Sequence, residues 1–552
     1  MGNSSVANRT GREWFSSLPA CLLLLAVVLF STSSDIHNQT LQLGEKLFSS
    51  YYKLRTDPVV PQCDRNVDID AEVARRVQAA ESAEDDLLGG LMGSAPVDPA
   101  VIRSSLENSV AACQRRFAEY EELNGRITPA LEAFRSVELF LADIIAFGLT
   151  SQRYILIFIV MICAATATMT RHHIALRGME TQLDYRVSYF LQFIANVMLT
   201  GSSWFFRAQT HAGGTDVPLE REVLHLLWIG SFAVISLFSL YRLFKAPDDL
   251  APGGKLGHAL LSVPLYTTMC LISGTYFALQ GHSAGIGIYL DKLMDLSDMF
   301  LNVALYVWVG MMLKETRLAT LIFDLFRPWR MPPELLAVVA VLVAAIPTAY
   351  TGASGIFVIA AGAVIYHELR AAGARRHLAL ASTAMSGSLG VVLRPCLLVV
   401  VIAYLNREVT TDELFGWGIW VFILTSALFA IVVLTVNRQS KIQFAPASEA
   451  LPGMLKAVMP LVPYILVMVG IVLFYRWGLN VKLDEFSAPR ILPVMLLGVL
   501  VYEHFRYREE RKAGFNPEQN KGLEGSLRSA TNLTTSEIGA LLLLFGLSVS
   551  IG

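Results

Sequence analysis

The sequence has few charged residues for its length. They make up 16% of the 552 residues, whereas soluble domains carry about 25%. Hydrophobic residues reach 54%, so we expect a polytopic membrane protein rather than a soluble enzyme with one anchor. Lys and Arg total 44 against 46 Asp and Glu, a net charge of −2. This near balance argues against nucleic acid as a partner.

Motifs for metal, nucleotide and redox chemistry are also missing. The chain has six scattered cysteines and no CxxC pair, which makes a zinc or iron–sulfur site an unfavourable interpretation. It has no Walker A loop and no GxGxxG run, so it resembles neither an ATPase nor a dehydrogenase. We therefore expect no organic cofactor and no catalytic residue.

The N-terminus carries the first apolar run. Residues 1–17 are polar and include Arg9 and Arg12, and an apolar run follows to about residue 33. This pattern fits a signal peptide or a retained anchor. We favour an anchor span over residues 1–33, because no A-x-A cleavage site is evident.

Residues 34–135 are the only stretch with a soluble composition. Asp98 and Pro99 read as an N-cap and a first helical residue, and Gly125 supplies a stop. We expect a small helical periplasmic insertion. Cys63 and Cys113 could pair there and close a loop of about 50 residues. The alternative is two unrelated thiols, with Cys113 part of an apolar helix stripe.

From residue 137 onward, apolar runs alternate with short polar loops. We expect an interfacial helix at 137–149 and then spans at 152–170, 188–207, 223–243, 256–280, 297–313, 334–350, 352–367, 378–405, 415–436, 457–475, 489–504 and 537–552. The fold class is therefore all-α and polytopic, with about thirteen apolar segments. Basic and acidic loops alternate along the chain, which predicts a cytoplasmic N-terminus in a bacterial inner membrane.

Some of these spans are irregular. Runs of about 16 residues at 352–367 and 489–504 reach only about 24 Å of a core about 30 Å thick. The run 378–405 contains Gly387, Gly390 and Pro395. Interrupted segments point to a transport site, because unwound backbone frees carbonyls for a cation and helix ends for an anion. A packing kink is the alternative.

Two stretches resemble the tripartite ATP-independent periplasmic (TRAP) transporters. The run SQRY at 151–154 and the run RHHIAL at 171–176 are similar to the small membrane subunit. The runs TGASG at 351–355, SGSLG at 386–390 and RPC at 394–396 are similar to the first half of the large subunit. In the family this half forms a re-entrant hairpin and a broken helix around a sodium site.

The resemblance implies a natural fusion of the two subunits. We expect a small-subunit-like scaffold at 136–245, a linker with a connecting span at 246–289, and a large-subunit-like transport domain at 290–552. The family's second, inverted repeat is not found. The expectation is therefore that the chain is a fragment, or that a second polypeptide carries that repeat.

The implied function is a membrane permease component of a sodium-coupled symporter. It would import an organic acid such as a dicarboxylate, delivered by a periplasmic substrate-binding protein, by an elevator-type movement within membrane lipids. Sodium candidates are Gly352, Ser354, Gly355, Ser386 and Gly390, and substrate candidates are Arg394, Pro395 and Thr383.

The chain departs from the family at Arg394, where a proline is usual. An intramembrane charge costs at least about 2.5–3.5 kcal/mol on insertion scales. Arg394 could bind a substrate carboxylate or replace the charge of a cation. Alternatively, it snorkels or pairs with backbone carbonyls.

Two other classes of function stay open. The GASG run around Ser354 also occurs in rhomboid-like intramembrane serine proteases, whose nucleophile needs a histidine within reach. The later histidines, His367, His377 and His504, lie beside loops rather than in mid-span. A non-transporting membrane scaffold is the other class, in which the small residues only let helices pack closely.

Overall fold

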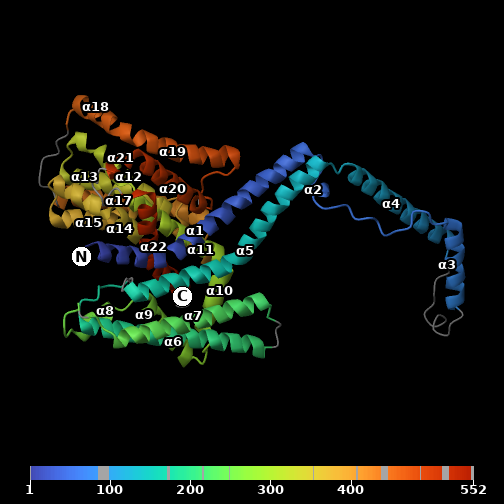
Figure 1. Ribbon diagram of the computed structural model, residues 1–552, viewed down its shortest axis with the longest axis horizontal. Helices are drawn as coiled ribbons and strands as arrows, with labels where there is room; N and C mark the ends of the chain where they lie inside the picture. The colour runs from blue at the N-terminus through green and yellow to red at the C-terminus, as the bar shows by residue number, and fades with distance from the viewer. Residues whose placement is uncertain are drawn as a thin grey trace. The chain divides into compact units, whose positions relative to one another are not determined.

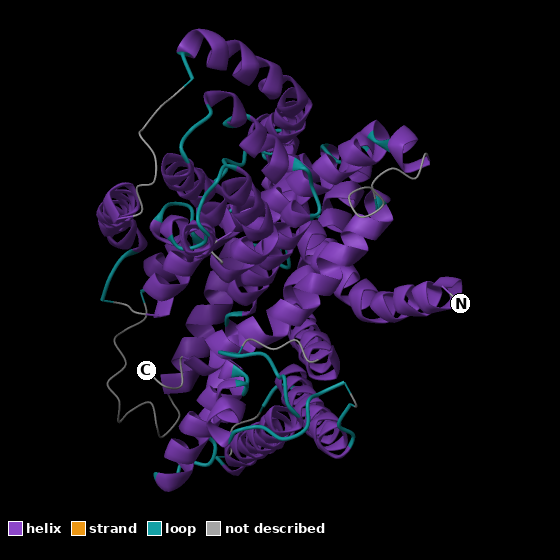
Figure 2. Ribbon diagram, turned by 90° about the vertical axis from the view of Figure 1, so that its left-hand side faces the viewer, coloured by secondary structure: helices purple, strands orange, loops and turns teal. Residues whose placement is uncertain are grey.

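The protein is helical throughout the part of the chain that the structure describes. The computed structural model describes residues 2–84, 98–170, 175–213, 217–247, 249–351, 354–405, 408–436, 445–484, 486–512 and 521–548. These residues form helices and loops, with a single isolated bridge between Thr181 and Ala251 (Figures 1 and 2). The predicted all-α fold class is confirmed.

The helices fall into three stretches of sequence. The first contains α1 (Gly2–Leu47), α2 (Tyr51–Leu54), α3 (Ile69–Glu84), α4 (Pro99–Gly125), α5 (Pro129–Thr170), α6 (Gln182–Ala212) and α7 (Leu219–Phe244). The second contains α8 (Leu256–Leu261), α9 (Leu265–Leu279), α10 (Gly285–Asp295), α11 (Ser297–Lys314), α12 (Leu318–Asp324), η2 (Arg327–Trp329), α13 (Pro333–Thr351) and α14 (Ser354–Ala371). The third contains α15 (Arg376–Ser386), η3 (Leu389–Val392), α16 (Leu397–Leu405), α17 (Thr411–Val436), α18 (Ala447–Val458), η4 (Met459–Leu461), α19 (Val462–Leu473), η5 (Phe474–Gly478), α20 (Ala488–Arg506), α21 (Arg508–Lys512) and α22 (Gly522–Ser548).

The helices are apolar enough for a multi-pass membrane protein. Among the described residues, seven candidate spans pass on length and composition, and an eighth passes if the bent pair α10 and α11 counts as one span. Other expected spans appear as shorter or broken helices, such as the 15-residue α9. Among the described residues, fewer helices therefore pass this test than the sequence has apolar runs.

Helix α5 differs from its predicted form. The sequence predicted an interfacial helix at 137–149 separate from the span at 152–170, but α5 is one helix of 42 residues. Gly148, near the end of the expected interfacial helix, packs against Phe30 of α1. A Cβ at this position would lie 2.6 Å from Phe30 Cγ. The glycine permits a close helix contact, so the prediction of a separate helix was wrong.

The chain divides into two compact units. Residues 33–145 form one unit, and residues 1–32 together with 146–552 form the other. In the first unit, the Asp98 carboxylate accepts a hydrogen bond from Ala100 N at 2.8 Å, and Pro99 begins α4. Helix α4 ends at Gly125. The predicted start and stop of this helix are therefore confirmed.

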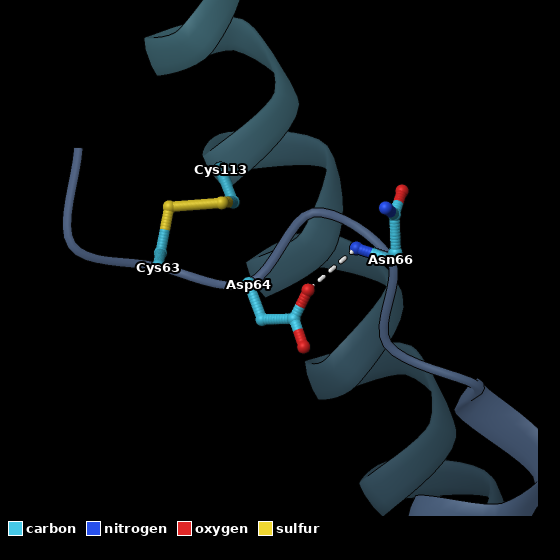
Figure 3. Close-up of a disulfide and its surroundings, with 4 residues drawn as sticks. All are labelled: Cys63, Asp64, Asn66 and Cys113. Carbon is cyan, nitrogen blue, oxygen red and sulfur yellow. Dashed lines mark hydrogen bonds between the residues drawn. A yellow bond between two sulfur atoms is a disulfide. The ribbon is translucent and has the colours of Figure 1, made fainter. Parts of the chain in front are cut away.

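A disulfide joins the segment before α3 to helix α4. Cys63, in the extended segment before α3, is bonded to Cys113 of α4, with the Cα atoms 6.0 Å apart (Figure 3). Beside it, Asn66 N donates a hydrogen bond to the Asp64 carboxylate at 2.9 Å. The structure thus brings together the two cysteines that the sequence singled out.

The same unit buries one carboxylate completely. Glu138 of α5 accepts hydrogen bonds from Arg55 Nε at 3.0 Å and from the Tyr51 hydroxyl at 3.2 Å, and it lies 2.6 Å from His37 Nε2. Burial, with the nearby Glu138 charge, raises the pKa of Tyr51 to about 12, so the phenol stays neutral and donates. A buried charge with several donors is satisfied.

We predict that Cys63→Ser loosens this unit. The disulfide spans 50 residues of sequence, and opening such a loop costs about 4 kcal/mol in the chain-entropy model. Limited proteolysis of the purified protein should cleave the segment 57–68 faster than in the wild type. Ser105→Ala, an exposed change on α4, is the control, and its digest should match the wild type. Equal digests for Cys63→Ser and the wild type would contradict the prediction.

Candidate ion and substrate site

Two helix breaks form the candidate site, and the first separates α13 from α14. Helix α13 is described as far as Thr351 and α14 from Ser354 onward, and residues 352 and 353 of the TGASG run lie outside the described part of the chain. Pro347 lies inside α13, one turn before this end. The sequence expected a short run at 352–367, but α14 continues to Ala371 and has 18 residues. It is about 27 Å long at 1.5 Å per residue.

The second break interrupts the run 378–405. Helix α15 ends at Ser386 with Gly387 as its C-cap, the 3-10 helix η3 follows, and α16 begins at Leu397. The Arg394–Pro395 peptide bond in this segment is cis. The interruption predicted from Gly387, Gly390 and Pro395 is therefore present as an unwound segment between two short helices.

The two breaks belong to neighbouring elements, because η3 packs on α13. A Cβ built on Gly390 would lie 2.2 Å from Ala345 O and 2.8 Å from Ala349 N of α13. Leu389 packs beside this contact in a small core with Val341 and Ala345. Backbone meets backbone here, so any side chain at position 390 forces the two elements apart.

Helix α17 holds η3 from another side through a second glycine. A Cβ on Gly418 would lie 2.2 Å from Val392 O. By contrast, nothing lies within 4 Å of a Cβ on Gly416, two residues earlier in the chain. The sequence analysis missed Gly418. Its only signal was a glycine pair inside an apolar helix, and that pair does not tell which glycine faces a neighbour.

Thr348 connects the two broken segments directly. Its hydroxyl lies 2.6 Å from Ala344 O, one turn back on α13, and 3.2 Å from Ser386 O at the end of α15. Thr348 is fully buried. This contact places the carbonyl end of α15 beside α13. Helix C-termini carry partial negative charge, so a cation is favoured there. The sequence analysis missed Thr348 as well.

The hydroxyls of the other candidates bond back to their own helix. Ser386 Oγ donates to Thr383 O at 2.7 Å, and Thr383 Oγ1 donates to Ala379 O at 2.8 Å. Such bonds are usual for Ser and Thr in membrane helices. Their oxygens keep lone pairs for a hard cation such as sodium.

Arg394 and Pro395 lie past η3, where the chain approaches α17. Arg394 is exposed, and its guanidinium pairs with Asp412 and lies over the Phe415 ring at 5.0 Å from the centroid. Pro395 is buried. The partner that the structure shows, the Asp412 carboxylate in the first turn of α17, was not among the alternatives considered for Arg394.

The remaining candidates cluster at the first break. Gly352 lies outside the described residues, and for Ser354 and Gly355 the structure describes only the backbone, at the start of α14. Within the described part of the chain, no group of three or more His, Cys, Asp and Glu side chains is placed to hold a metal ion. Any cation at these breaks would therefore rely on carbonyl and hydroxyl oxygens.

Comparison with known families adds one finding. A family model described as "Tripartite ATP-independent periplasmic transporter, DctM component" matches residues 256–550. A search of curated proteins returns no match. The matched region contains both helix breaks and every sodium and substrate candidate. It also includes 256–289, which the sequence analysis had treated as a linker.

We predict that Gly390→Ala is strongly destabilising. The added Cβ would overlap Ala345 O, and overpacking of this kind costs typically about 1–3 kcal/mol. The thermal unfolding midpoint of the detergent-purified protein should fall by several degrees. Gly416→Ala is the matched control, because nothing lies within 4 Å of its Cβ position. Equal midpoints for the two variants would show that the close approach is not required.

Proposed function

The chain belongs to the family of the tripartite ATP-independent periplasmic transporter DctM component, and from this premise we propose that it is the permease component of a sodium-coupled importer of organic acids. Membership is shown by the match over residues 256–550, more than half of the chain. The protein is a multi-pass membrane transporter component and not an enzyme. The serine protease interpretation of Ser354 is therefore dropped.

The convergence of two helix breaks is the observation that carries the sodium proposal. The C-terminal part of α13 contacts both η3 and the end of α15, and Thr348 bonds to the Ser386 carbonyl. Partial negative charge from two helix ends, together with unwound carbonyls, suits a hard cation. We assign sodium to this point, with oxygens drawn from Gly352, Ser354, Gly355, Ser386 and Gly390.

The N-terminal ends of the helices that follow the two breaks favour an anion. Helices α14 and α16 both begin at the breaks, and a helix N-terminus attracts negative charge. A substrate carboxylate would lie there, near Thr383 and Pro395. In this proposal Arg394 releases the Asp412 carboxylate and binds the carboxylate of the substrate instead. The exchange is feasible because both partners are carboxylates and the Arg394–Asp412 ion pair is exposed.

Separate hydrophobic cores support an elevator-type movement. One core includes Trp228, Trp308 and Leu496, and it joins α1, α5, α6, α7, α9, α10, α11, α12, α19, α20 and α22. A second core joins α13, α14 and α15, and includes Ala344 and Ile365. Because side chains pack mainly within each core, we propose that the second moves against the first and carries the site with it.

Ion pairs support the fusion of a small-subunit-like scaffold. Arg221 of α7 pairs with Asp291 of α10 at 2.5 Å and with Asp295 at 3.3 Å, and Arg153 of α5 lies 3.8 Å from Asp295. These pairs connect the helices expected as the scaffold to the start of the family match. We propose an inner-membrane protein with a cytoplasmic N-terminus, which takes its substrate from a periplasmic substrate-binding protein.

We predict that sodium stabilises the purified protein in the absence of substrate. A ligand at 100 times its dissociation constant adds about 2.7 kcal/mol to the folded state. The thermal unfolding midpoint should rise with NaCl and stay constant with choline chloride at the same ionic strength. A midpoint that depends equally on both salts would count against sodium binding.

We predict further that Thr348→Val and Ser354→Ala weaken this effect. Loss of one hydrogen bond of about 1 kcal/mol corresponds to about a fivefold rise in the half-saturating sodium concentration. Thr435→Val is the matched control, because Thr435 also bonds to its own helix, at Ile431 O, but is exposed on α17. If all three variants respond alike, the sodium site lies elsewhere.

A further inference from the structure

An apolar cleft lies within the larger unit, beside the candidate site. Its volume is about 300 Å³, and it is lined by α11, α12, α19 and α20 on one side and by α13 and α14 on the other. Leu318 and Leu496 belong to the first hydrophobic core, whereas Ala344 and Ala361 belong to the second. The cleft is thus a gap between two cores, each of which is well packed.

The lining of this cleft is apolar except for the Tyr350 side chain. Covering such apolar surface with another apolar group is favourable. One of the lining residues, Ile346, is 63% exposed, so the cleft opens on the apolar surface of the helices. The bilayer is the apolar phase next to that surface, and it can supply an acyl chain.

A polar pocket continues the cleft at one end. It has a volume of about 420 Å³ and shares Phe323 and Phe326 with the apolar cleft. The side chains around it include Arg327, Arg330 and Glu368. Together the two pockets form an apolar cleft that leads to an opening with charged side chains, which we call the mouth. An amphipathic ligand, with an apolar tail and a charged head, would match this arrangement.

One guanidinium group at this mouth has no ion pair among the described residues. Arg327 is neutralised, because it bonds to Glu368 at 2.6 Å and to Asp324 at 2.9 Å. Arg330 is exposed and has no ion pair among the described residues. Its backbone is left-handed, with φ 43°, a conformation that is uncommon for a residue other than glycine. Arg330 therefore presents an exposed guanidinium group that is not engaged by a carboxylate.

The mouth also lies at the expected depth for a lipid headgroup. The loop that contains it carries Lys314, Arg317, Arg327 and Arg330, which the positive-inside rule places on the cytoplasmic side. Trp329 stands next to Arg330 and donates its indole N–H to Met454 Sδ at 3.4 Å. Tryptophans of this kind are enriched at the membrane–water interface.

We propose that the cleft and its mouth bind an anionic phospholipid of the cytoplasmic leaflet. One acyl chain occupies the apolar cleft between the two cores, and the phosphate contacts the Arg330 guanidinium. Basic pockets between membrane helices on the cytoplasmic side bind anionic headgroups in this way. The lining of the cleft reaches Pro347 and Tyr350 near the end of α13, but it includes none of the residues proposed to bind sodium or substrate.

The experiment uses the full chain in phosphatidylcholine vesicles that contain phosphatidylglycerol with a photoactivatable acyl chain. After irradiation, mass spectrometry locates the labelled peptides. We expect labelling around Met468 and Met495, which line the cleft. Arg330→Gln should lower this labelling about fivefold, the factor for the roughly 1 kcal/mol that one arginine contributes near an anionic surface.

Two further variants keep the test decisive. Arg375→Gln removes an exposed arginine from another loop expected on the cytoplasmic side and should leave the labelling unchanged. Ala319→Phe places a ring in the cleft and should abolish labelling there even with Arg330 present. Labelling of the cleft by a phosphatidylcholine probe at the same level, or an equal loss in Arg375→Gln, would overturn the proposal. The readout is lipid occupancy, so it stands or falls independently of sodium transport.

Discussion

The close approach of backbone at η3 is the constraint on which the candidate site depends. Gly390 lets η3 reach the carbonyl of Ala345, and Gly418 lets α17 reach the carbonyl of Val392. An unwound segment in a membrane must be covered by protein, because lipid offers no hydrogen-bond partners. The two glycine contacts provide this cover, and they hold the second helix break beside α13.

The Thr348 contact, the two hydrophobic cores and the apolar cleft are interpreted in relation to this arrangement. Thr348 fixes the end of α15 against α13, so the partial charges of two helix ends add at one place. In the proposed elevator-type movement, the second hydrophobic core would carry that place with it. The apolar cleft lies where the cores meet, so an occupying lipid would seal the gap against water and ions while leaving the cores free to slide.

Much of this could be predicted from the sequence, because the main signals were local. Low charge and long apolar runs gave the all-α membrane class, and the glycines and proline at 387–395 marked the broken helix. Contacts between helices could not be predicted in the same way. Gly416 and Gly418 look alike in the sequence, yet only Gly418 meets another backbone. In the same way, the sequence predicted a separate helix at 137–149, whereas α5 is continuous and Gly148 contacts Phe30.

The central claim is that sodium binds where the two helix breaks meet. Hydrogen–deuterium exchange with and without sodium tests it most directly, because local opening of the backbone sets the exchange rate. The account predicts that sodium slows exchange in peptides covering 345–358 and 384–396, and that choline does not. Exchange in α18 and α19, away from the breaks, should be the same in both salts. No protection at the breaks, or protection spread evenly over the chain, would contradict the account.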